Sequence, residues 1–155
     1  MEFTLDEVLR KAVNAHKAGQ IQEARRLYTA VLNAQSNHPD ANHNMGVLTA
    51  SVGKAEEALP LFKIALEVNP NIVQYWLSYI DCLIKLDRIS DARVVFDQAK
   101  GKGVNSEEFD RLEDRLANTS SNNDKLQTPP SSQLQSIINL FTRGQLRQAL
   151  SEATE

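Results

Sequence analysis

The sequence predicts an all-α fold, a right-handed α-solenoid in which antiparallel helix hairpins stack on one another. The first observation is a fixed period of 34 residues, at which Gly53 lies over Gly19, and Phe62 lies over Tyr28 and Phe96. The second is that alanines recur at the same spacing, as two short helices need where they approach each other closely. A fixed period of this length is the signature of a stacked helical repeat.

The first unit covers about residues 5–38 and contains two helices. Thr4 and Glu7 have the spacing of a capping box, in which side chain and backbone satisfy each other at a helix start. Gly19 ends the first helix, because glycine adopts the left-handed backbone conformation at little cost. The unit is therefore a helix hairpin with a tight turn.

The second unit covers about residues 39–72. Pro39 suits the first turn of a helix, where its missing N–H would have no partner. Gly46 allows the helix behind it to approach closely, and Gly53 breaks the helix. Pro60 lies inside the second helix, where we expect at most a slight bend because the apolar pattern continues beyond it.

The third unit covers about residues 73–104. Asp87 stands where the earlier units have a turn glycine, a tolerable change because aspartate visits the left-handed region more readily than most residues. Tyr75, Trp76 and Tyr79 could form an aromatic binding patch, but their helical spacing favours core packing. The repeat region as a whole spans 4–104, with helices expected over about 4–18, 21–35, 39–52, 54–68, 72–86 and 89–100.

Beyond residue 104 the period is expected to stop. Asn105 and Glu108 have the spacing of a second capping box, which predicts a non-repeat amphipathic helix over 105–117. A polar linker with two prolines should follow over 118–133. An incomplete fourth repeat is predicted over 134–155, and because it stops inside its second helix we expect the sequence to be part of a longer protein.

Composition limits the classes of function. The chain has 155 residues, of which 41% are hydrophobic and 24% charged, as in folded proteins. A net charge of −3 gives no basic surface for nucleic acid or an anionic membrane. The single cysteine, Cys82, excludes an internal disulfide and a thiolate metal cage. Without a secretion signal or a run of about 20 apolar residues, the expected location is cytoplasmic.

The turn glycines, the aligned alanines and the three aligned aromatic residues resemble the tetratricopeptide repeat family. The resemblance covers about 5–104 as three repeats and 131–155 as most of a fourth. It implies that the first helix of each repeat lines a concave groove, which holds an extended peptide or a partner's helix. It also implies which residues line this groove: Leu9, Arg10, Val13, Lys17, His43, Asn44, Val47, Gln74, Ser78 and Asp81.

Asn44 is the groove residue for which the resemblance implies most. Chaperone-binding members of the family hold a terminal carboxylate with lysines, asparagines and an arginine, and only Asn44 agrees among the matching places here. In repeat arrays that belong to O-linked N-acetylglucosamine transferases, an asparagine at this place bonds the backbone of a threaded peptide. A side-chain amide offers donor and acceptor together, so it can pair with a peptide of any sequence. We expect Asn44 to be either such a contact or a solvated groove residue.

A narrower resemblance concerns the phrases A-N-H-N-M-G-V-L and A-L-P-L-F-K. They are similar to the leading repeats of large bacterial proteins in which the array precedes a part related to O-linked N-acetylglucosamine transferases, or a sulfotransferase. On this resemblance the chain would be the substrate-presenting arm of a larger enzyme.

The function predicted from these observations is a non-catalytic scaffold that binds a protein or extended peptide. No nucleophile–base set, paired catalytic carboxylates or phosphate loop is present in the sequence, and no cofactor or metal is expected. The three histidines do not share a helix face at ligand spacing. Two alternatives stay open: the substrate-presenting arm, and a module that self-associates into a homo-oligomer through the incomplete last repeat.

Overall fold

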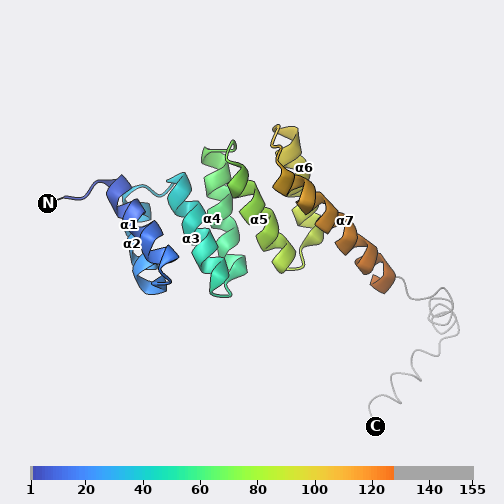
Figure 1. Ribbon diagram of the computed structural model, residues 1–155, viewed down its shortest axis with the longest axis horizontal. Helices are drawn as coiled ribbons and strands as arrows, with labels where there is room; N and C mark the ends of the chain where they lie inside the picture. Colours follow the sequence, from blue (N-terminus) through green and yellow to red (C-terminus); the bar gives the residue numbers. More distant parts are fainter. Residues whose placement is uncertain (1, 128–155) are drawn as a thin grey trace, which may run out of the picture. The chain divides into compact units, whose positions relative to one another are not determined.

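The computed structural model describes residues 2–127. This part of the chain holds seven helices and no strand, and Figure 1 shows α1 to α6 lying side by side in chain order. The helices are α1 (Leu5–Lys17), α2 (Ile21–Ala34), α3 (Pro39–Ser51), α4 (Ala55–Val68), α5 (Val73–Lys85), α6 (Ile89–Gly101) and α7 (Glu107–Gln127).

The predicted fold class is confirmed. Helices pack as the hairpins α1–α2, α3–α4 and α5–α6, and each hairpin also contacts the next. The first residues of equivalent helices are separated by the predicted period of 34 residues. The first helices begin at Leu5, Pro39, Val73 and Glu107, and the second helices begin at Ile21, Ala55 and Ile89.

The turns use the local chemistry that the sequence indicates. The Thr4 backbone N–H donates to Glu7 Oε2 at 2.8 Å and the Glu7 N–H donates to Thr4 Oγ1 at 3.3 Å, so the capping box is confirmed. Gly19 and Gly53 have φ of 72° and 85°. Asp87 has φ of 57°, so it takes the left-handed conformation of the glycines it replaces.

The core lies between the helices of each hairpin and between successive hairpins. Tyr28 and Phe62 are completely or almost completely buried, in two separate apolar clusters. Tyr75, Trp76 and Tyr79 are also buried, so they are core residues as their spacing predicted. These aromatic side chains of α5 fill the space between the second and third hairpins.

The structure differs from the prediction beyond residue 104. α7 begins at Glu107, and Ser106 rather than Asn105 caps it, since Ser106 Oγ accepts from the Phe109 N–H at 3.2 Å. The helix continues to Gln127, through residues expected to begin the linker over 118–133. No proline or glycine occurs between 104 and 127 to break it.

The position of α7 also corrects the expectation that the period stops. Its start lies 34 residues after that of α5, and Phe109 takes the place of Tyr75, stacking on Phe96 with ring centroids 4.7 Å apart. The first part of α7 is therefore a fourth first helix. The predicted incomplete repeat over 134–155 lies outside the described residues. Among residues 2–127 there is no helix of the length and apolar character that would cross a membrane.

Candidate peptide-binding groove

The period places the predicted groove residues in rows across the first helices. Residues 34 apart occupy equivalent positions on α1, α3, α5 and α7, and α3 contacts both α1 and α5. One row is Leu9, His43, Leu77 and Arg111; the next is Arg10, Asn44, Ser78 and Leu112; the third is Val13, Val47, Asp81 and Arg115.

His43 is the centre of the contact between α3 and α5. Its Nε2 lies 2.8 Å from Ser78 Oγ, and its Nδ1 lies 3.2 Å from Asn44 Oδ1. The imidazole stacks on the Tyr75 ring, with centroids 4.8 Å apart and planes at 28°. Only 8% of His43 is exposed, so this predicted groove residue joins two helices rather than projecting freely into the groove.

The electrostatic environment keeps His43 neutral. Burial lowers the pKa of its imidazole below the usual 6.5, although the Asn44 hydrogen bond and the Asp40 carboxylate act in the opposite direction. Beside it, the Tyr75 hydroxyl donates to Asp40 Oδ1. Burial, and secondly this bond, raise the pKa of Tyr75, so the phenol stays protonated. The centre of the site is therefore uncharged apart from Asp40.

The polar residues of α5 continue this network. Gln74 Nε2 donates to Ser78 Oγ at 3.3 Å, so the structure brings Gln74, Ser78, His43 and Asn44 together in one chain of hydrogen bonds. Asn44 is half-buried, and its Nδ2 makes no hydrogen bond within the described part of the chain. An amide with free donors thus remains available beside the network.

The α1 residues are not part of that network. Leu9 and Val13 are half-buried and pack against the first apolar cluster, whereas Arg10 and Lys17 are exposed. Val47 packs in the same way against the second cluster. The first helix therefore contributes apolar contacts and two cations, separate from the amide network of α3 and α5.

The other end of the groove lies between α5 and the first part of α7. A hollow of about 410 Å³ is lined by Gln74, Leu77, Ser78, Asp81, Glu108, Arg111, Leu112 and Arg115. Both terminal nitrogens of Arg115 lie 3.4 Å from Asp81 Oδ1, and Lys85 Nζ lies 2.8 Å from Asp81 Oδ2. Asp81, a predicted groove residue, is thus held by two cationic side chains.

Sequence reasoning missed the residues that α7 contributes. Glu108, Arg111 and Arg115 lie 34 residues after Gln74, Leu77 and Asp81, and line the same hollow. The signal was present in the sequence, since extending the period by one more unit places all three on the groove.

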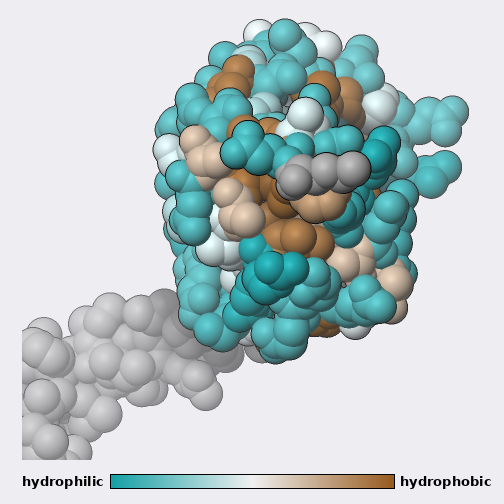
Figure 2. All heavy atoms as spheres, turned by 90° about the vertical axis from the view of Figure 1, so that its left-hand side faces the viewer, coloured by the Kyte–Doolittle hydropathy of each residue, from teal (hydrophilic) through white to brown (hydrophobic). Residues whose placement is uncertain are grey.

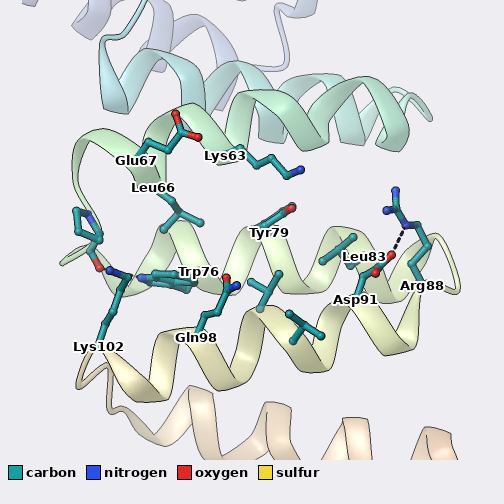
Figure 3. A pocket seen from close by; sticks show the side chains of 13 residues that line it. Lys63, Leu66, Glu67, Trp76, Tyr79, Leu83, Arg88, Asp91, Gln98 and Lys102 are labelled. Carbon is teal, nitrogen blue, oxygen red and sulfur yellow. Dashed lines mark hydrogen bonds and ion pairs between the residues drawn. The ribbon is translucent and has the colours of Figure 1, made fainter.

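A second hollow is lined mainly by the second helices α4 and α6, with α5 as its floor. Its volume is about 580 Å³, and Figure 3 shows Trp76 and Tyr79 facing into it. The indole N–H of Trp76 donates to the Pro70 carbonyl at 2.8 Å, which fixes the ring against the loop between hairpins. Lys63 and Glu67 border it on α4.

The first hairpin, α1 and α2, forms one end of the stack of helices. An apolar patch is exposed on this end (Figure 2). Phe3 is 55% exposed there, with Lys11 Nζ placed 3.4 Å from the centre of its ring. A shallow hollow on this end is lined by Phe3, Val8, Ala15 and Leu27 among others. Within residues 2–127, no further hairpin packs on this end of the stack, whereas α3 and α4 have α2 and α5 beside them.

The candidates for chemistry are few. No group of three histidine, cysteine, aspartate or glutamate side chains within residues 2–127 is placed to hold a metal ion. Cys82 is buried, and its Sγ lies 3.3 Å from the Ala55 carbonyl oxygen. Burial raises the pKa of the thiol, which keeps it protonated and a poor nucleophile.

The fold and groove define an all-α repeat protein with paired antiparallel helices. Residues 50–116 match the tetratricopeptide repeat family. This match agrees with the resemblance to tetratricopeptide repeats that the turn residues and aligned alanines suggested. A search of curated proteins finds no significant match.

Solved structures agree with this fold. The TPR domain of Sgt2 from Aspergillus fumigatus is 19% identical with a TM-score of 0.69, over 81% of this chain and 85% of that one. The first TPR of Spaghetti (RPAP3), bound to an HSP90 peptide, is 15% identical with a TM-score of 0.68, over 76% and 93%. The Yersinia enterocolitica chaperone SycD, in complex with a peptide of the translocator YopD, is 16% identical with a TM-score of 0.63, over 76% and 90%.

Proposed function

We propose that this chain is a non-catalytic scaffold whose groove, formed by the first helices, binds an extended segment of a partner protein. The observation that carries the proposal is the Asn44 amide, whose Nδ2 has no acceptor among residues 2–127 and which lies beside a polar network on α3 and α5. Peptide binding by similar folds supports it, since the Spaghetti and SycD structures contain bound peptides.

The composition of the groove indicates how such a segment would be held. Val47 and Leu77 provide half-buried apolar contacts near the middle, while Asn44 can bond a main-chain group of any sequence. Exposed Arg10 lies in the same row as Asn44, on α1. Main-chain contacts and apolar side chains would therefore contribute more than capture of a terminal carboxylate.

The experiment is a selection of twelve-residue peptides from a random display library on the purified protein, followed by fluorescence anisotropy with the selected peptide. Asn44→Ala should weaken binding about 3–10-fold, the value of one hydrogen bond, and adding Arg10→Ala should weaken it further. Asn33→Ala is the matched control, because Asn33 is an exposed asparagine on α2.

Circular dichroism must show unchanged helicity for each variant. A peptide whose affinity survives both groove changes, or falls equally in Asn33→Ala, would place binding elsewhere on the molecule. The substrate-presenting arm and the self-association module stay predictions, the latter because its residues, 134–155, lie outside the described part of the chain.

A further inference from the structure

The contact between His43 and Asn44 determines where the imidazole proton lies. His43 Nδ1 is 3.2 Å from the amide oxygen of Asn44. An amide oxygen can only accept a hydrogen bond, so Nδ1 must carry the hydrogen. The hydrogen-bond partner of one ring nitrogen thus determines which of the two nitrogens of the imidazole is protonated.

The other ring nitrogen is then an acceptor. In a neutral imidazole only one nitrogen carries hydrogen, so Nε2 accepts from the Ser78 hydroxyl, 2.8 Å away. The Ser78 oxygen in turn accepts from Gln74 Nε2 at 3.3 Å. Every group in this chain of bonds has one consistent direction, from Gln74 through Ser78 to His43 and on to Asn44.

Burial of the ring favours its neutral state, although Asp40 raises the pKa of His43. Tyr75 of α5 stacks on one face, Phe62 of α4 lies 5.8 Å away between centroids, and Asp40 of α3 is the charged group nearby. Asp40 accepts the Tyr75 hydroxyl hydrogen, so its carboxylate is already engaged. Burial among aromatic rings disfavours the imidazolium.

We infer that His43 is a positioning residue for peptide binding. It holds the Asn44 oxygen and thereby turns both Nδ2 hydrogens toward the groove, so the site recognises a hydrogen-bond acceptor, such as a main-chain carbonyl oxygen of the bound segment. This inference rests on the proposed function. It adds the direction of the hydrogen bond, in which Asn44 donates and the bound segment accepts. Without His43 the amide would rotate and present oxygen or nitrogen alike.

The first test uses nitrogen NMR of the unaltered protein at pH 7.5, with imidazole signals assigned by loss in His43→Phe. We expect the Nδ1–H tautomer for His43 and a single ordered conformation for the Asn44 side-chain amide. In His43→Phe, which keeps an aromatic ring against Tyr75, the Asn44 amide should become rotationally averaged. An Nε2–H tautomer, or an Asn44 amide equally ordered in both proteins, would overturn the inference.

The second test is a double-mutant cycle with a peptide selected from the display library. His43→Phe should weaken binding about 3–10-fold in the unaltered background, and less than about twofold in the Asn44→Ala background. Equal losses in both backgrounds would mean that His43 acts independently of Asn44, and the positioning role would be wrong. Thermal unfolding of each variant verifies the fold.

The two tests separate this inference from the proposed function. If no peptide binds the groove, the proposed function fails, while the tautomer and the order of Asn44 still decide whether His43 positions the amide. If His43→Phe does not fold, Ser78→Ala replaces it: loss of the Nε2 bond should leave the Nδ1–H tautomer and the Asn44 orientation intact. A shift to Nε2–H in that variant would contradict the assignment.

Discussion

Replacing Gly46 by alanine tests whether the close approach of α3 and α4 is obligatory. A Cβ at Gly46 would lie 2.8 Å from Cε1 of Phe62 and 3.1 Å from its Cδ1 and Cζ. Carbon atoms in contact are normally about 3.5–4.0 Å apart, so the ring would have to move. Phe62 is 1% exposed, and its ring lies against His43 and Tyr79, which leaves it little room.

Two effects of opposite sign decide the magnitude. Alanine is favoured over glycine inside a helix by about 1 kcal/mol. Overpacking a filled core costs about 1–3 kcal/mol. Because the ring is confined on several sides, we expect the clash to cost about 2–3 kcal/mol, the upper part of that range, which leaves a net loss of about 1–2 kcal/mol in the free energy of unfolding.

Urea denaturation followed by circular dichroism measures this loss. Gly101→Ala is the matched control, because Gly101 is also helical but has nothing within 4 Å of its added Cβ; it should be neutral or stabilising by up to about 1 kcal/mol. In the Gly46→Ala background, Phe62→Leu should cost less than it does alone, since it relieves the clash. A Gly46→Ala protein as stable as the unaltered one would refute the reasoning.

Three further predictions concern stability. Asn42→Leu should cost about 1–3 kcal/mol, since this 1% exposed amide donates to the Ser36 and His38 carbonyls, and only the His38 carbonyl would keep another donor, the backbone N–H of residue 42; urea denaturation measures it, and an unchanged midpoint would contradict it. Phe62→Ala should cost about 3–5 kcal/mol and unfold the stack, seen as a lower melting temperature. Burial lowers the pKa of both His16 and His43, so the folded state binds their protons less tightly than the unfolded chain. Stability should be fully present above pH 6.5 and fall as the pH drops below it, and a flat profile between pH 8 and 5 would exclude this.

Much of the fold was predictable because its signals are local. The capping box of Thr4 and Glu7 needs only residues three apart, and the positive φ of Gly19 is one that glycine adopts without steric cost. Asp87 takes the same conformation, which aspartate visits more readily than most residues. The burial of Phe62 followed from a period that any stacked helix must obey. The end of α7 was not predictable from polar composition, because a run without proline or glycine can be helix or linker.

The period gives the positions of the candidate groove residues along the first helices, but not the contacts that each one makes. The period places Asn44, Ser78 and Asp81 on the groove, and one more unit would have added Arg111 and Arg115. His43, in contrast, was expected only to line the groove, and it is 8% exposed. Its burial depends on a tyrosine and a serine in the next hairpin, and no pattern within α3 indicates them.

By itself the sequence determined that this chain forms stacked hairpins, since turn glycines, small residues and aromatic residues at a fixed spacing specify one packing of neighbouring helices. Only the tertiary structure decided that α7 continues to Gln127 and that His43 bonds both Asn44 and Ser78. The reason is physical: the direction of a hydrogen bond depends on which atoms meet, and the Ser78 hydroxyl that bonds His43 comes from the next hairpin.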